Sequence, residues 1–244
     1  MCGIFGISSD NNFKQKEFTR LAALSERRGR DSSGLLYFQN EEYSIDRADY
    51  RIGQLISNTN IENPSLMIGH TRLITDGQAD NQPVVKDNLA IIHNGIMVNT
   101  KEYWKNSSLE REYQIDTEVI LAIALEHIAE SSPLENLHER IEEKCKGSFS
   151  CALIIKDQGK MLLLSNTGSL FTGVKNNCSY FASEKHFLSS LDVSDISQLF
   201  GTKVIDIPES SKEFLITENN KNRANLIPSF SDSAEEESKL IFPT

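Results

Sequence analysis

The sequence has little of what marks secreted, membrane-spanning or nucleic-acid-binding proteins. Four cysteines among 244 residues are too few for a disulfide scaffold, and they show no metal-site spacing. The longest apolar run, 119–125, is far shorter than the roughly 20 residues that cross a bilayer. No basic segment followed by an apolar one opens the chain as in a secretory signal. Acidic residues outnumber basic ones, 35 to 25, which argues against nucleic-acid binding, because that would need a clustered basic face. We therefore expect a cytoplasmic protein with reduced thiols, no metal, and no nucleic-acid or membrane partner.

The pattern of apolar residues predicts one large α+β domain. A chain with 39% hydrophobic residues can bury a substantial core. Helices are predicted over 13–28, 116–130, 133–144 and 183–191, and strands over 34–38, 43–46, 66–71, 89–93, 147–155, 161–164, 170–174 and 180–182. Asn94-Gly95 predicts a turn after the fourth of these strands, and Asp116 is placed to cap a helix. Strands, then helices, then strands again indicate two sheets covered by helices.

The last residues differ in composition from the rest. We place a folded domain at 2–217 and a polar, acidic tail at 218–244, which ends in the apolar cluster Leu240-Ile241-Phe242. Two interpretations stay open: a frayed tail or one that docks on its own domain, and a segment that inserts into a partner protein.

Cys2 is the residue with the most chemical information. It follows the initiator methionine, and removal of that methionine would leave one residue with both a thiol and a free α-amine. The thiolate is the attacking species of cysteine, and an α-amine with a pKa of roughly 7.7–8.0 can serve as its base near neutral pH. Alone, Cys2 could equally be a core cysteine on a first strand or a lipidation site.

Polar residues lie at several predicted strand and helix ends, where a plain core would not require them. These segments are Arg28-Gly29-Arg30-Asp31-Ser32-Ser33-Gly34, Gly69-His70-Thr71-Arg72, Asn81-Gln82-Pro83, His93-Asn94-Gly95 and Asp116-Thr117-Glu118. Each alone has a structural explanation as an ion pair, a turn or a helix cap. Their order behind Met1-Cys2-Gly3-Ile4-Phe5-Gly6 resembles the glutaminase domain of the class II glutamine amidotransferases. Glucosamine-6-phosphate synthase, amidophosphoribosyltransferase and asparagine synthetase belong to that family.

The resemblance implies a fold and a reaction. The fold is that of the N-terminal-nucleophile hydrolases, a four-layer αββα sandwich with two mainly antiparallel sheets between helix layers. By resemblance, Cys2 attacks the γ-amide of L-glutamine and forms a thioester, and its α-amine transfers the proton. The Asn94 side chain and the Gly95 N–H are implied to bind the oxyanion. Hydrolysis of this kind requires no cofactor.

The resemblance also implies how the rest of glutamine is bound. Arg72 suits the α-carboxylate because its guanidinium can bind bidentately, and Thr75 would add a hydrogen bond there. Asp116 suits the α-ammonium group. Arg28 and Asp31 are expected to support the loop beneath the nucleophile.

Two departures from the family pattern concern the acceptor of ammonia. Leu73-Ile74-Thr75 follows Arg72 where the aminosugar synthase has tryptophan and histidine, and Ile96 follows Gly95 where asparagine synthetase has glutamate. No synthase motif is present, so we expect a glutaminase subunit that passes ammonia to a separate synthase. Two alternatives are an N-terminal cysteine amidohydrolase acting on another amide and a weakly active regulatory or scaffold subunit.

Overall fold

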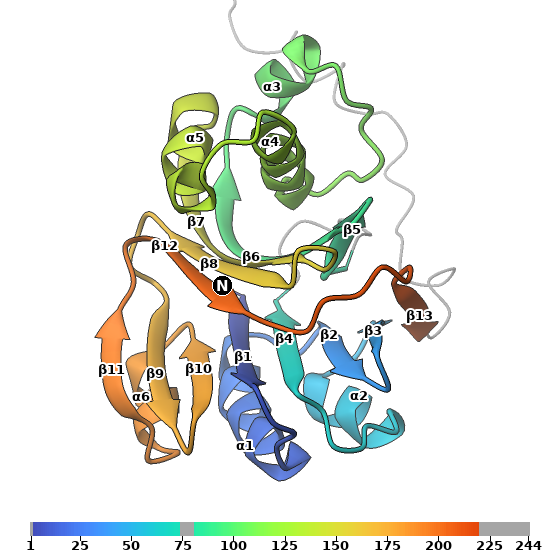
Figure 1. Cartoon of the computed structure of the whole chain (residues 1–244), viewed down its shortest axis with the longest axis vertical. Coiled ribbons are helices and arrows are strands. Elements are labelled where there is room, and N and C mark those ends of the chain that lie inside the picture. The colour runs from blue at the N-terminus through green and yellow to red at the C-terminus, as the bar shows by residue number, and fades with distance from the viewer. Residues whose placement is uncertain (1, 74–80, 220–244) are drawn as a thin grey trace, which may run out of the picture.

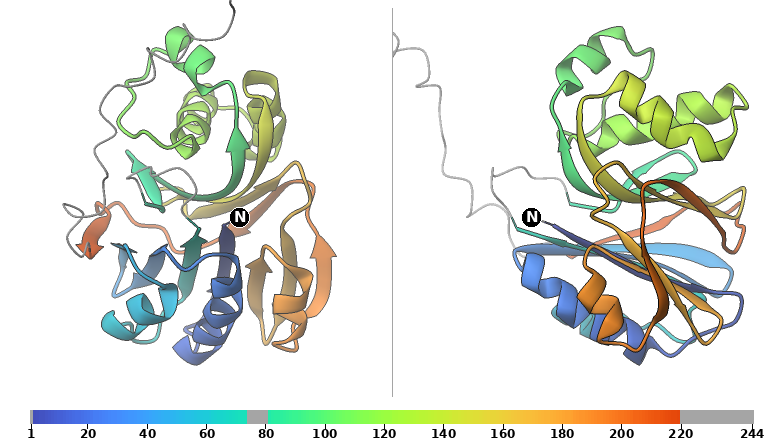
Figure 2. Two further views of the ribbon diagram at one scale, coloured as in Figure 1. Left: turned by 180° about the vertical axis from the view of Figure 1, so that it is seen from behind. Right: turned by 90° about the vertical axis from the view of Figure 1, so that its left-hand side faces the viewer.

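Two β-sheets lie face to face between two layers of helices (Figures 1 and 2). The computed structural model describes residues 2–73 and 81–219. The strands of the described residues are β1 Gly3–Ser9, β2 Ser32–Gln39, β3 Glu42–Ala48, β4 Leu66–Arg72, β5 Val84–Lys86, β6 Leu89–Met97, β7 Gly147–Ile155, β8 Lys160–Ser165, β9 Phe171–Lys175, β10 Cys178–Ala182, β11 Ser194–Gln198, β12 Gly201–Asp206 and β13 Leu215–Asn219. The helices there are α1 Gln15–Ser25, α2 Ile52–Asn58, α3 Thr100–Asn106, α4 Thr117–Ala129, α5 Leu137–Lys144 and α6 Lys185–Ser189, with single 3-10 turns at η1 Glu26–Arg28 and η2 Leu134–Asn136.

The predicted sandwich of mainly antiparallel sheets is confirmed. Within the described ranges, eight strands form one sheet in the order β11-β9-β10-β1-β4-β2-β3-β13, and five form the other in the order β12-β8-β7-β6-β5. Neighbouring strands run antiparallel, apart from the described pair β13 and β3. Helices α1, α2 and α6 cover the larger sheet, and α3, α4 and α5 lie over the smaller one (Figure 1).

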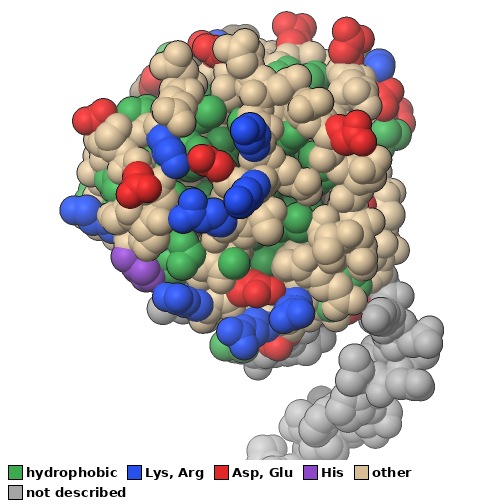
Figure 3. All heavy atoms as spheres, turned by 90° about the horizontal axis from the view of Figure 1, so that it is seen from below, with side chains coloured by type: hydrophobic (Ala, Val, Ile, Leu, Met, Phe, Trp, Pro, Cys, Tyr) green, Lys and Arg blue, Asp and Glu red, His purple; other side chains and the backbone are tan. Residues whose placement is uncertain are grey.

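Alternation along the strands divides the core into three layers. On β6, Leu89 and Ile91 pack against the α4 side, whereas Ala90 and Ile92 pack between the sheets. This is the period of two that a strand buried on both faces requires. The outer face below the larger sheet carries lysine, arginine, aspartate and glutamate side chains interspersed (Figure 3), as expected for a face in contact with water.

Strand β1 lies in the interior of the larger sheet and fixes the start of the chain. It pairs with β10 on one side and with β4 on the other. Ile4 packs between the sheets, and Phe5 and Ile7 pack under the helices. Gly6 leaves room for an aromatic ring, because a Cβ there would lie 2.3 Å from the ring of Phe181. The residue before β1 is therefore held at a defined point.

Most of the predicted elements are present, but a predicted turn is replaced by a strand. The helix predicted over 116–130 is α4, and the strand predicted over 147–155 is β7. The turn predicted at Asn94-Gly95 does not exist, because β6 continues to Met97 with Gly95 paired to Phe149 of β7. The predicted domain boundary at residue 217 falls within β13, and residues 220–244 of the predicted tail lie outside the described residues.

Candidate active site

A cavity of about 420 Å³ opens where the start of β1, the end of β4, the end of β6 and the segment before α4 meet. Cys2, Arg72, Gly95 and Asp116 line it together. These four predicted residues come from segments far apart in the sequence, so the fold itself assembles the site. Thr75, which was also predicted to contact the substrate, lies outside the described residues.

Cys2 is half-buried at the cavity, and its main chain is anchored from two directions. Arg28 Nε donates a hydrogen bond of 2.7 Å to the Cys2 carbonyl, and the Arg28 guanidinium is paired with Glu184. Two residues on, Ile4 N–H donates to Ser183 Oγ at 2.9 Å. The expectation that Arg28 supports the nucleophile therefore corresponds to a direct contact with its main chain.

The pKa of the Cys2 thiol lies above its ordinary value. Burial raises this pKa, and the charge of Arg72, the N–H of Leu73 and the charge of Arg28 lower it only partly. A cysteine with such a pKa is mostly a neutral thiol near pH 7. Its attack on an amide would therefore require a base within reach of the sulfur.

Arg72 is the last residue of β4 and is buried beside the cysteine. Its carbonyl accepts a hydrogen bond of 3.0 Å from the N–H of Asp31, one of the two residues predicted to support the loop beneath Cys2. Gly29 permits this close packing, because a Cβ there would lie 2.3 Å from the carbonyl carbon of Arg72. The loop over 28–31 thus fits against the backbone that carries the arginine.

Gly95 has a steric role at the cavity wall. A Cβ at this position would lie 2.0 Å from the Ser148 carbonyl oxygen and 2.6 Å from His93 Nε2. Glycine is therefore required by close packing within a continuous strand, and not by a turn. Asn94 is half-buried and is not among the described residues that line the cavity. Alternation along β6 places Asn94 on the face of Ile92, which packs between the sheets.

Asp116 does not cap α4 through its side chain, contrary to the sequence-based expectation. It occupies the N-cap position with helical backbone angles, and its carboxylate makes no capping hydrogen bond. Asp116 Oδ2 instead accepts a hydrogen bond of 2.8 Å from the N–H of Met97, at the end of β6. This contact joins the start of α4 to the strand that carries Gly95, and it keeps the carboxylate at the cavity.

Gln82, His93 and Thr117 form a buried polar group that sequence reasoning gave no role, and Gln82 and His93 line the cavity. Gln82 Oε1 accepts the N–H of His93, and Gln82 Nε2 donates to Thr117 Oγ1 at 3.2 Å. His93 Nδ1 lies 3.2 Å from the same hydroxyl. All three residues belong to the Asn-Gln-Pro, His-Asn-Gly and Asp-Thr-Glu segments. Membership of these segments is the sequence signal that could have pointed to them. Their contacts connect β6 to α4 across the wall of the site.

Neither buried histidine near the site is suited to be the base. Burial, the charge of Arg72 and the neighbouring His93 lower the pKa of His70 to about 3. Burial also lowers the pKa of His93, although Asp116 and the Ser148 carbonyl act in the other direction. Both imidazoles are therefore neutral near pH 7, and a lowered pKa makes each a weaker proton acceptor.

Two further findings concern residues 2–73 and 81–219. No cluster of three histidine, cysteine, aspartate or glutamate side chains is close enough there to hold a metal ion. No helix of this part of the chain is long and apolar enough to cross a membrane.

Comparison with known proteins identifies the family. A family model described as a glutamine amidotransferase domain matches residues 70–190. The glutamine–fructose-6-phosphate aminotransferase of Zymomonas mobilis is 28% identical over 202 residues, which are 78% of this chain and 33% of that protein. The Chlamydia caviae protein of the same name is 33% identical over 195 residues, 75% of this chain and 32% of that one. This chain thus spans about a third of the length of these relatives.

Solved structures show the same fold at lower identity. The glutamine phosphoribosylpyrophosphate amidotransferase of Bacillus subtilis superposes with a TM-score of 0.65 and 19% identity, over 84% of this chain and 49% of that one. A structure described as the allosteric regulatory enzyme of purine biosynthesis gives a TM-score of 0.62 over 87% of this chain and 50% of its own. The chain therefore belongs to the class II glutamine amidotransferases and has their N-terminal-nucleophile hydrolase fold.

Proposed function

We propose that this domain hydrolyses L-glutamine to L-glutamate and ammonia through a thioester on Cys2, and that the ammonia passes to a synthase. The observation that carries the proposal is the cavity that Cys2, Arg72, Gly95 and Asp116 share. A nucleophile, a cation, a backbone N–H and a carboxylate are the groups that an amide with a zwitterionic amino-acid head requires.

The charges at the cavity suit the amino-acid head of glutamine. The Arg72 guanidinium can bind the α-carboxylate through two parallel hydrogen bonds, and Thr75 would add a third. Asp116 would bind the α-ammonium group while its Oδ2 stays bonded to Met97 N–H. With the head group bound in this way, the side chain of glutamine would extend toward Cys2. An amide without such a head group would lose these contacts.

The first chemical step would form the thioester. After removal of Met1, the neutral α-amine of Cys2 takes the thiol proton as the sulfur bonds to the γ-carbonyl carbon. The oxyanion that results would be bound by the Gly95 N–H and by the Asn94 amide. One such donor contributes on the order of 10²–10³ in rate. The C–N bond then breaks, and the leaving nitrogen takes the proton from the α-ammonium group and departs as ammonia.

The second step would release glutamate. The α-amine, again neutral, takes a proton from a water molecule as its oxygen attacks the thioester carbon. Collapse of this second oxyanion breaks the C–S bond, and the proton returns to the sulfur. The cysteine is then a thiol again, and the products are L-glutamate and ammonia.

We further propose that the ammonia acceptor is a synthase on a separate subunit. The match covers only about a third of the length of the aminotransferases named above, which supports an acceptor site outside the residues described here. Copurification of the untagged native protein with a synthase would support a separate subunit. Of the two interpretations of the tail over 218–244, insertion into a partner protein is the one that would give it a part in binding this synthase. The four cysteines are free thiols. Because thiols stay reduced in the cytoplasm, we propose the cytoplasm as the compartment.

Labelling of the cysteine by a glutamine-shaped electrophile tests the proposed function. The purified protein is treated with a γ-diazoketone analogue of glutamine, and its intact mass and peptides are analysed. We expect one adduct on Cys2, protection by L-glutamine, and no adduct on Cys151, which is fully buried. Cys2→Ala should abolish both labelling and ammonia release. Ammonia release that persists in Cys2→Ala, or a Cys2 adduct that glutamine does not prevent, would contradict the proposal.

A further inference from the structure

The segment over 107–116, between α3 and α4, forms one wall of the cavity without any helix or strand of its own. Arg111, Gln114, Ile115 and Asp116 of this segment line the cavity. Such a segment has no ladder of backbone hydrogen bonds to hold it in place, so its position depends on contacts made by side chains. We call it the wall segment.

A buried ion pair outside the cavity holds the wall segment. Lys86, the last residue of β5, has a side chain that is 6% exposed, and Glu118 of α4 has one that is 0% exposed. Their Nζ and Oε1 atoms are 3.2 Å apart. Neither residue is among the described residues that line the cavity. Any effect of the pair on substrate would therefore pass through the segment between them.

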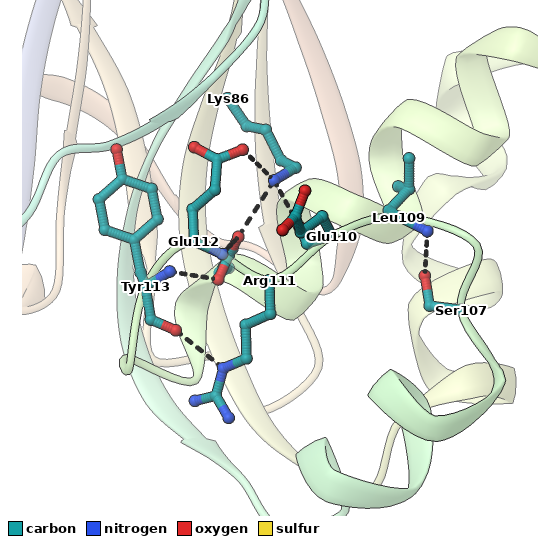
Figure 4. A network of polar contacts seen from close by, with 8 residues as sticks. Lys86, Ser107, Leu109, Glu110, Arg111, Glu112 and Tyr113 are labelled. Carbon is teal, nitrogen blue, oxygen red and sulfur yellow. Dashed lines mark hydrogen bonds and ion pairs between the residues drawn. The ribbon is translucent and has the colours of Figure 1, made fainter.

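Both partners of the pair also bond directly to the wall segment. Lys86 Nζ donates to the Glu110 carbonyl at 2.8 Å and to Glu112 Oε1 at 2.5 Å. Figure 4 shows the Lys86 side chain reaching the segment between Glu110 and Glu112. Glu118 Oε1 accepts the N–H of Glu112 at 2.8 Å, and Glu118 Oε2 accepts the N–H of Tyr113 at 2.9 Å. Three residues of the wall segment, Glu110, Glu112 and Tyr113, thus take polar partners from this one pair.

Lys86 carries a positive charge in this pair. Burial lowers the pKa of Lys86, but hydrogen bonds and the negative charges of Glu112 and Glu118 raise it above the ordinary value overall. A charged ammonium donates stronger hydrogen bonds than a neutral amine. The wall segment also has hydrogen bonds of its own, because the Arg111 side chain donates to the carbonyls of Tyr113 and Gln114 at 2.8 Å each.

We propose that Lys86 and Glu118 are positioning residues for glutamine: they fix the wall segment so that Asp116 meets the α-ammonium group. This inference rests on the proposed function of the cavity. Lys86 lies on the same hairpin as Gly95, since β5 pairs with β6. The pair therefore keeps the ammonium-binding residue and the oxyanion-binding strand at a constant separation. Loss of the pair would weaken recognition of glutamine and leave the sulfur itself accessible and reactive.

Two electrophiles separate positioning from a general structural role. The γ-diazoketone analogue of glutamine needs the wall segment in place, whereas iodoacetamide needs only an accessible Cys2. In Lys86→Met we expect the labelling rate with the diazoketone to fall about tenfold or more, with the iodoacetamide rate within about twofold of wild type. Lys86→Arg, which keeps the charge, should restore the diazoketone rate to within about threefold. The matched control is Lys160→Met, which removes an exposed lysine paired with Asp206.

Equal loss of both labelling rates, or an unchanged diazoketone rate, would overturn the proposal. If Lys86→Met does not fold, Glu112→Gln provides the test, because Glu112 is 56% exposed and its loss leaves the Lys86–Glu118 pair intact. We expect a loss of about threefold in the diazoketone rate for that variant, and no loss would contradict positioning.

Hydrogen exchange separates this inference from the proposed function. The N–H groups of Glu112 and Tyr113 should exchange faster in Lys86→Met than in wild type, whether or not the cavity takes glutamine. A wild-type protein that iodoacetamide labels and the diazoketone does not would count against the proposed function. Unchanged exchange at these two N–H groups would count against the inference.

Discussion

The guanidinium of Arg28 holds the main-chain carbonyl of Cys2 at a donor–acceptor distance of 2.7 Å. The same guanidinium is paired with Glu184, which directly precedes α6. The predicted nucleophile is therefore positioned by its own main chain as well as by the strand that follows it. An amino-terminal residue positioned in this way keeps sulfur and α-amine in one orientation relative to the cavity.

Removal of this contact should slow catalysis more than it weakens binding. In Arg28→Ala we expect kcat for glutamine hydrolysis to fall about tenfold or more, because small displacements of a reacting group have large effects on rate. The measurement is steady-state ammonia release with thermal unfolding recorded in parallel. Arg27→Ala, which changes the exposed neighbour in η1, is the matched control and should behave like wild type. An unchanged kcat in Arg28→Ala would show that the hydrogen bond to Cys2 has no role in the reaction.

Asn94 should act on the chemical step. Asn94→Ala removes a donor that is proposed to bind the oxyanion, so kcat should fall by about 10²-fold with KM changed far less. Asn12→Ala, an exposed asparagine before α1, is the control. The structure does not place Asn94 among the described lining residues, which makes this prediction a sharp test. A kcat within about threefold of wild type would contradict the oxyanion role of the side chain.

Gly95 should tolerate no side chain. In Gly95→Ala the added Cβ would lie 2.0 Å from the Ser148 carbonyl oxygen, which is backbone paired within the sheet and cannot easily move. We expect the free energy of unfolding to fall by about 1–3 kcal/mol, as in other overpacked sites. Gly53→Ala in α2 is the matched control, since its Cβ would find its nearest atom at 3.4 Å, an ordinary contact distance. That variant should be neutral or more stable by up to about 1 kcal/mol. Equal stabilities of the two variants by urea unfolding would refute this account.

The buried His70 should make the protein less stable in acid. Its pKa is about 3 in the folded chain and roughly 6.5 when unfolded, so between these values the unfolded state binds the proton and the folded state does not. The contribution of neutral His70 to the free energy of unfolding is therefore fully present above pH 6.5. It is lost as the pH falls, by up to about 1.4 kcal/mol per pH unit. In His70→Gln the free energy of unfolding should depend less steeply on pH between about 6.5 and 4. Exposed His186→Gln is the control. If the free energy of unfolding depends on pH with the same slope in wild type and in His70→Gln, this prediction is wrong.

Much of the fold follows from patterns that are local in the sequence. The apolar side of the helix predicted over 116–130 is that of α4, and the strand predicted over 147–155 is β7 at its observed bounds. Short elements such as α2, of seven residues, and β5, of three, were not predicted, because so few residues do not establish a periodic pattern. The motifs pointed to Cys2, Arg72, Gly95 and Asp116, which the fold brings together at one cavity.

The wrong predictions arose where a contact between segments distant in sequence overrides a local pattern. Asn-Gly favours a turn when judged alone, but at residue 95 the approach of Ser148 from the neighbouring strand decides the conformation. Asp before a helix favours a cap when judged alone, but the Met97 N–H at the end of β6 takes the Asp116 carboxylate. The pairing of Lys86 with Glu118 joins residues 32 positions apart, and no local pattern contains it.

The central place of β1 has a consequence for how the protein should lose activity. Chain termini commonly fray first and exchange their amide hydrogens fastest. Here the first strand is hydrogen-bonded on both sides and buried on both faces, so its amides should be among the last to exchange, at a rate set by global unfolding. Partial opening elsewhere would leave the predicted nucleophile in place. On heating, Cys2 should therefore keep its position until the larger sheet melts cooperatively.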